Sequence, residues 1–72
     1  MAAAHVAPNG TNWNLTGDGT LISTHRIQED ALTAARQWLG ANGGGELFIH
    51  GEDGAVRAKD TVAPGNDPSG RG

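Results

Sequence analysis

Three dipeptides that favour tight two-residue turns constrain the fold of this chain most strongly. They are Asn9-Gly10, Asp18-Gly19 and Asp53-Gly54. A type I′ turn needs a positive φ at both central residues, which Asn, Asp and Gly tolerate, so each dipeptide marks the tip of a β-hairpin. Each tip also fixes which residues face one another across the two strands. The chain is therefore expected to form two consecutive hairpins near its N-terminus and one near its C-terminus.

The register of the two N-terminal hairpins predicts one apolar face. A turn at Asn9-Gly10 sets Val6 opposite Trp13, and a turn at Asp18-Gly19 sets Leu15 opposite Ile22. Side chains alternate along a strand, so these four apolar residues share one face of a three-stranded meander. The other face is polar and carries His5, Asn12, Asn14, Thr16 and Ser23.

One helix is expected after the meander, over residues 28 to 39. Apolar residues recur there at helical spacing, and Glu29 and Asp30 lie in the first turn, where the helix dipole favours acidic side chains. Ile27 is a poor N-cap residue, and Gly40 is expected to end the helix. The residues expected to pack onto the sheet are Ala31, Ala35, Trp38 and Leu39.

The C-terminal hairpin carries the most distinctive surface chemistry. A turn at Asp53-Gly54 sets His50 opposite Arg57 and Phe48 opposite Lys59. These four side chains then form one outward cluster, in which an aromatic ring lies beside fixed cations, and they are the candidate binding residues. The core face of the same hairpin is aliphatic and is formed by Leu47, Ile49, Val56 and Ala58.

These elements predict a single small α+β domain. We expect an antiparallel sheet of order β-β-β-α-β-β with one helix packed on its aliphatic face. The compact domain is expected over residues 1–60 and a Pro- and Gly-rich C-terminal tail over residues 61–72. A chain of 72 residues without cysteine has a small core and no disulfide, so a homo-oligomer is the expected source of further stability.

The sequence contains no motif typical of an enzyme. It lacks the spacing of a P-loop, a dinucleotide-binding loop, a zinc protease or a calcium loop. No nucleophile, base and orienting group occur in a recognisable arrangement. His5, His25 and His50 have no close His or Cys neighbours in sequence, so no metal site is predicted. The protein is therefore expected to be non-enzymatic, with no catalytic residues and no cofactor.

Charge and hydropathy narrow the expected partners and location. The net charge of -3 gives no general attraction to nucleic acid or to an anionic membrane. The N-terminus lacks the basic and apolar segments of a signal peptide, and no apolar run reaches the length of a membrane span. We therefore expect a cytoplasmic protein, in the host cytoplasm if the chain is encoded by a phage.

Four phrases resemble, in order, the family called domain of unknown function 2188, which comprises small bacterial and phage proteins. The phrases are "HVAPNGTNWNL", "QEDALTAAR", "GGELFIHGEDGAVRAKD" and "GNDP", and they extend from residue 5 to about residue 68. Members are short single-domain proteins with no established activity, so the resemblance implies the element order and no catalytic residue. The chain departs from the family at Ile27, where members have a hydroxyl residue, and after "GNDP", where members have an aromatic residue or further prolines.

The sequence therefore predicts a non-enzymatic interaction module that self-associates and binds a bacterial or host protein, and that modulates a host process if a phage encodes it. The alternative is nucleic-acid binding through Phe48, His50, Arg57 and Lys59, which the negative net charge disfavours. A third interpretation is that the same cations only prevent edge-to-edge pairing of strands.

Overall fold

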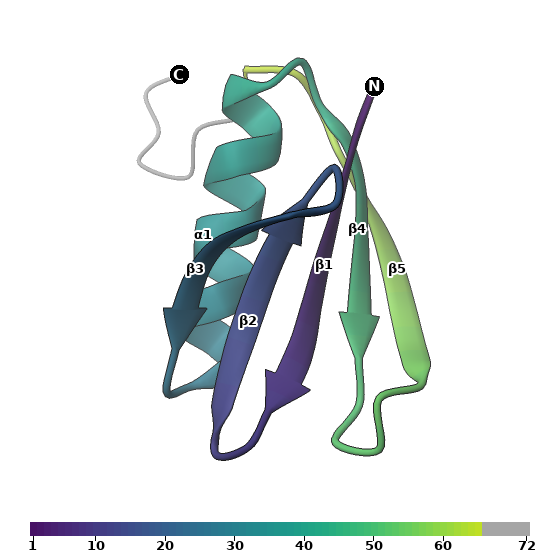
Figure 1. Cartoon of the computed structure of the whole chain (residues 1–72). Helices are drawn as coiled ribbons and strands as arrows, with labels where there is room; N and C mark the ends of the chain where they lie inside the picture. The colour runs from purple at the N-terminus through teal and green to yellow at the C-terminus, as the bar shows by residue number, and fades with distance from the viewer. Residues whose placement is uncertain (66–72) are drawn as a thin grey trace.

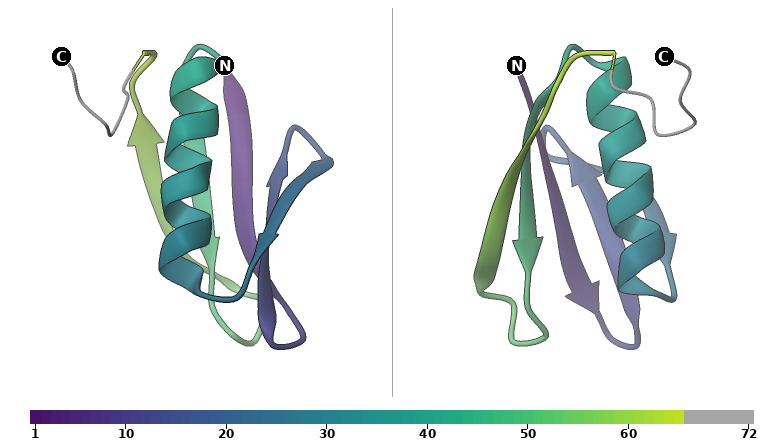
Figure 2. Two further views of the ribbon diagram at one scale, coloured as in Figure 1. Left: turned by 90° about the vertical axis from the view of Figure 1, so that its left-hand side faces the viewer. Right: turned by 180° about the vertical axis from the view of Figure 1, so that it is seen from behind.

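Five strands and one helix follow one another in the predicted order. The computed structural model describes residues 1–65. The elements are β1 (Ala2–Asn9), β2 (Asn12–Gly17), β3 (Thr20–His25), α1 (Gln28–Ala41), β4 (Gly45–His50) and β5 (Val56–Val62). They form one sheet in the order β3-β2-β1-β4-β5, with α1 against one face of it (Figure 1). The two further views in Figure 2 show the same two layers, so the predicted α+β class is confirmed.

The sheet is mixed and not purely antiparallel as predicted. β1 lies at its centre, antiparallel to β2 and parallel to β4. Turn dipeptides specify only pairs of consecutive strands, and the pairing of β1 with β4 joins strands that three other elements separate in the chain. The chain passes through α1 before β4 aligns beside β1, as expected for a parallel crossover.

The first hairpin turns one residue later than predicted, at Gly10-Thr11. Val6 therefore faces Leu15 and not Trp13. Gly10 has a φ of 63°, whereas Asn9 remains in the extended strand, so the expected type I′ turn does not form there. Moving the turn by one residue changes each cross-strand partner by two residues, so the alternation of side chains stays the same. Val6, Trp13 and Leu15 therefore share the helix side of the sheet as predicted.

A β-bulge in the second hairpin corrects the prediction for Ile22. The tip at Asp18-Gly19 is as predicted, with φ values of 49° and 86°. The register then shifts between Leu15 and Thr16, so that Leu15 faces Ser23. The extra residue leaves Ile22 41% exposed, and its predicted place on the core face was wrong.

A second bulge changes the C-terminal hairpin. Phe48 faces Lys59 as predicted, but the register shifts between Ile49 and His50. His50 consequently faces Val56 and not Arg57. Val56 was expected in the core and is 53% exposed, because the bulge reverses the side on which it lies.

Helix α1 is two residues longer than predicted. Gly40 is buried inside it, and Asn42 is the C-cap residue. The residue that takes the left-handed conformation after the helix is Gly43, with a φ of 88°, and the Gly44 N–H donates to the Leu39 carbonyl at 2.7 Å. At the other end Ile27 provides no side-chain cap, as expected. This helix is too short and too polar to span a lipid bilayer.

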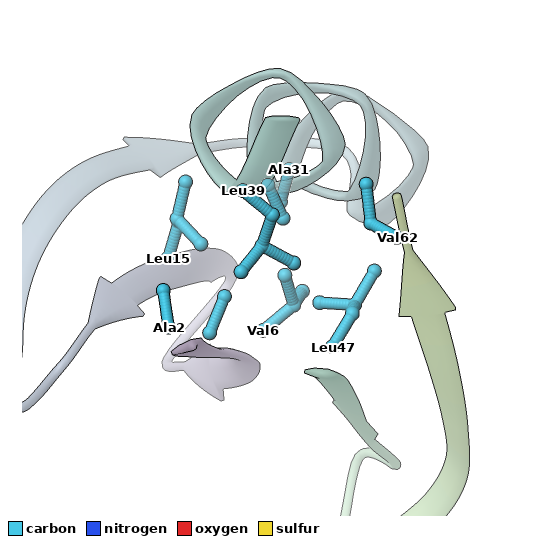
Figure 3. Packing of buried hydrophobic residues seen from close by; sticks show 9 residues of the cluster. Ala2, Val6, Leu15, Ala31, Leu39, Leu47 and Val62 are labelled. Atoms are coloured by element: carbon cyan, nitrogen blue, oxygen red, sulfur yellow. The ribbon is translucent and has the colours of Figure 1, made fainter. Parts of the chain in front are cut away.

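The core lies between α1 and the sheet and is small (Figure 3). Four of its nine residues are alanines, which let the helix approach the strands closely. The predicted contacts of Ala31, Ala35 and Leu39 are confirmed, and Trp38 is half-buried with its ring over Gly17. The buried residues are Ala2, Ala4, Val6, Leu15, Ala31, Ala35, Leu39, Leu47 and Val62.

The last strand continues past residue 60, where the predicted domain ends. Val62 is in β5 and only 3% exposed, so it belongs to the core. The Gly65 N–H then donates to the Gly40 carbonyl at 2.8 Å, which holds the chain against the end of α1. The predicted tail from residue 66 onward, including most of the "GNDP" phrase, lies outside the described residues.

Candidate functional site on the open face of the sheet

One face of the sheet, here called the open face, points away from α1. It is the face toward the viewer in Figure 1, and no other element of residues 1–65 covers it. Strand alternation places on it the side chains between the buried ones. Its central residues are His5, Ala7, Asn14, Thr16, Glu46, Phe48, His50, Lys59 and Thr61.

Three rings from β1 and β4 form the centre of the open face, here called the aromatic cluster. His5 lies beside Phe48 in the parallel register, and the two rings stack with centroids 4.7 Å apart and planes 16° apart. His5 Nδ1 lies 2.9 Å from His50 Nε2. Sequence reasoning placed Phe48 and His50 on one face but missed His5 as their neighbour, because no turn signal links β1 to β4.

The hydrogen bonds of the aromatic cluster fix the protonation of both imidazoles. His50 Nδ1 lies 2.7 Å from the Gly54 carbonyl oxygen, which only accepts, so this nitrogen carries the proton. In the neutral ring Nε2 of His50 is then an acceptor, and it accepts from Nδ1–H of His5. The cluster is therefore a chain of two donors that ends at a backbone carbonyl.

The pKa of His5 lies below its ordinary value of 6.5. The larger cause is burial of the ring, which disfavours the charged form, and the smaller is the nearby His50. Burial therefore favours the neutral form of the His5 ring.

We expect the protein to become less stable as the pH falls below 6.5. Because the folded state lowers the pKa of His5, the unfolded chain binds the proton more readily. The stability from His5 is fully present above 6.5 and is lost as the pH falls through the lower folded-state pKa. His50 touches the ring, and Glu46 and Lys59 flank Phe48 on the same face.

This pH dependence is measured by urea unfolding at a series of pH values from about 8 to about 5. His5→Gln keeps a polar side chain that does not titrate, so its unfolding midpoint is expected to depend less on pH. An equal slope for His5→Gln and the unaltered chain would contradict the assignment to His5.

The four predicted binding residues are only partly brought together. Phe48 and Lys59 face each other, and His50 joins Phe48 in the aromatic cluster. Arg57 is the residue displaced by the bulge, and it forms an exposed ion pair with Asp53 at 2.7 Å. Its predicted position opposite His50 was therefore wrong, because the sequence gives no signal for the bulge.

A carboxylate also lies on the open face. Glu46 is two residues before Phe48 and accepts a hydrogen bond from the Thr61 hydroxyl at 3.1 Å. Within residues 1–65, the face thus combines one cation near Phe48, namely Lys59, with one carboxylate, Glu46. This mixed charge differs from the basic surface that phosphate binding favours.

The third histidine is separate from the aromatic cluster. His25 faces Trp13 across β2 and β3, on the helix side, and its Nε2 lies 2.8 Å from the Ser23 hydroxyl. Within residues 1–65 no group of three or more His, Cys, Asp or Glu side chains is placed to hold a metal ion. The two imidazoles that do converge are those of His5 and His50.

Comparison with known proteins identifies the family. A family model described as "Uncharacterized protein conserved in bacteria (DUF2188)" matches residues 4–62, which include the aromatic cluster and all of the core except Ala2. No curated protein and no solved structure matches the chain. The match extends over nearly all of the described sheet and helix, and the chain therefore belongs to the bacterial family called domain of unknown function 2188.

Proposed function

We propose that this protein is a non-enzymatic interaction module, which self-associates and binds a bacterial or host protein through its open face. The observation that carries the proposal is the bare sheet face with Phe48 at its centre. Phe48 itself is half-buried, and two apolar side chains toward the margins of the face are exposed, Leu21 at 57% and Val56 at 53%. Exposed apolar groups on one surface are typical of interaction sites, and the small core leaves stability to be gained by covering them.

The open face supports association better than the sheet edges do. The outer strands are β3 and β5, and each is paired to its neighbour through a β-bulge. Bulges twist an edge and interrupt its ladder, which disfavours addition of a further strand. A partner is therefore expected to pack on the face around Phe48.

The hydrogen bonding of the aromatic cluster supports a binding role over a catalytic one. A catalytic histidine needs a nucleophile or substrate proton within reach and an orienting group. Among the described residues the ring nitrogens of His5 and His50 bond to each other and to a backbone carbonyl, and no hydroxyl donates to them. The arrangement orients the rings and activates no side chain.

Nucleic-acid binding remains a prediction of the sequence, with less support. Of its two cations only Lys59 lies beside Phe48, since Arg57 pairs with Asp53. Glu46 on the same face and the net charge of -3 oppose a phosphate backbone. Phage origin likewise remains a prediction.

The solution mass of the purified chain tests the proposal. We expect light scattering over a concentration series to show an oligomer, and Phe48→Ala to weaken its association at least about tenfold, as for a central interface residue. Val56→Asp is expected to do the same, and because Val56 is exposed the substitution leaves the core intact. Gln37→Ala changes an exposed residue of α1 and is the control. A monomer at every concentration, or variants with unchanged mass, would contradict self-association.

A further inference from the structure

We propose that His5 and His50 form a two-imidazole site for a divalent transition metal ion of the nickel, copper or zinc type. The proposal rests on the geometry of the aromatic cluster and is independent of self-association. Imidazole nitrogen is a preferred ligand of these ions, whereas calcium and magnesium prefer oxygen. Both residues lie on the open face and are partly exposed.

The separation of the two ring nitrogens fits a shared ion. His5 Nδ1 and His50 Nε2 are 2.9 Å apart. Two imidazoles bound at about 2.0–2.1 Å place their nitrogens about 2.9 Å apart at a right angle and about 3.4 Å apart at a tetrahedral angle. This spacing equals that of adjacent positions on a square-planar or octahedral ion. The ring centroids are 5.1 Å apart, so the two nitrogens point at each other, and each ring must turn by about 45° to direct its lone pair at a shared ion.

Neighbouring groups orient the rings of His5 and His50, as they do for metal-binding histidines. Metal-binding histidines almost always donate their other N–H to a carboxylate, a backbone carbonyl or water. His50 makes this bond through Nδ1 to the Gly54 carbonyl at 2.7 Å, which leaves a lone pair on Nε2 facing His5. The His5 ring is fixed by its stacking on Phe48. One ring is thus oriented by a hydrogen bond and the other by packing.

Metal binding replaces the hydrogen bond between the rings. The proton on Nδ1 of His5 moves to Nε2, so that both facing nitrogens present a lone pair and the ring stays neutral. The N–H···N bond is lost and two metal–nitrogen bonds form. No third ligand is placed nearby within residues 1–65, so water or donors of another molecule complete the coordination.

Titration of the full chain with Ni²⁺ in a non-coordinating buffer tests this site. We expect saturable binding of one ion per chain, or one per two chains if a second copy completes the coordination, and none of Mg²⁺. NMR should show selective broadening of the His5 and His50 ring signals by the paramagnetic ion. His5→Gln and His50→Gln are each expected to weaken binding at least about tenfold, while His25→Gln leaves it unchanged.

Three outcomes of these measurements would contradict the metal site. Absence of saturable Ni²⁺ binding, broadening centred on His25, or equal affinity of His5→Gln and the unaltered chain would each exclude the site. The NMR readout uses the unaltered protein, so it decides the question even if a variant fails to fold. Repeating the titration with Leu21→Asp separates the two proposals, because this exposed position on β3 is separated by β2 from the strands of His5 and His50, and a loss of self-association there is expected to leave both imidazoles in place.

Discussion

Replacing Gly45 with alanine is expected to destabilise the protein by about 3 kcal/mol, which is a large part of the stability of a domain of this size. Gly45 is buried at the start of β4 and pairs with Ala2 of β1. A Cβ atom at this position would overlap the Ala2 carbonyl oxygen and lie 2.7 Å from its carbon. The obstacle is backbone on the neighbouring parallel strand, so no side-chain rotation relieves it. Urea unfolding followed by tryptophan fluorescence measures the loss.

The matched control is Gly43→Ala in the same loop. Gly43 has a φ of 88°, but a Cβ atom there would meet nothing within 4 Å. The substitution is therefore expected to cost only the strain of a left-handed alanine, about 1 kcal/mol. If both variants lost the same stability, the effect at Gly45 would be loss of glycine flexibility, and close approach of β1 and β4 would not be its cause.

The contact of Gly45 with Ala2 belongs to the part of the fold that sequence patterns do not predict. Turn dipeptides, strand alternation and helical periodicity are local patterns, and they predicted the strands, the helix and the helix-facing side of Val6, Trp13 and Leu15. The parallel pairing of β1 with β4 is not local. It is selected by packing of α1 across the sheet, and no dipeptide signals it.

The residues of the candidate site also include some that local sequence patterns predicted and some that they did not. Phe48 and Lys59 were predicted to face each other because both lie on one hairpin before its bulge. Arg57 was misplaced because one extra residue near the tip reverses every side chain beyond it. His5 was missed because its neighbours are on β4, and only the tertiary pairing brings its ring to Phe48 and His50. The residues that define the metal proposal are thus joined by the strand pair that the turns could not predict.

The second large effect is expected for Leu39→Ala, with a loss of about 3 kcal/mol. Leu39 is fully buried between α1 and the sheet, as Figure 3 shows. Alanines make up four of the nine core residues, so few large side chains carry the apolar contacts. The largest fully buried ones are Leu15, Leu39, Leu47 and Val6. Removing one of them leaves a cavity that the short helix, held at its end by Gly44 and Gly65, has little freedom to close.

Leu32→Ala provides the comparison for Leu39→Ala. Both leucines are in α1 and lose the same atoms, but Leu32 is half-buried at the margin of the core, so its loss is expected to be about 1 kcal/mol. Urea unfolding should give a lower midpoint for Leu39→Ala with an unchanged denaturant slope, since the two-state reaction exposes the same surface. Equal losses at the two positions would mean that helix propensity dominates. A much larger loss at Leu39 would show that the core between α1 and the sheet carries the stability of this domain.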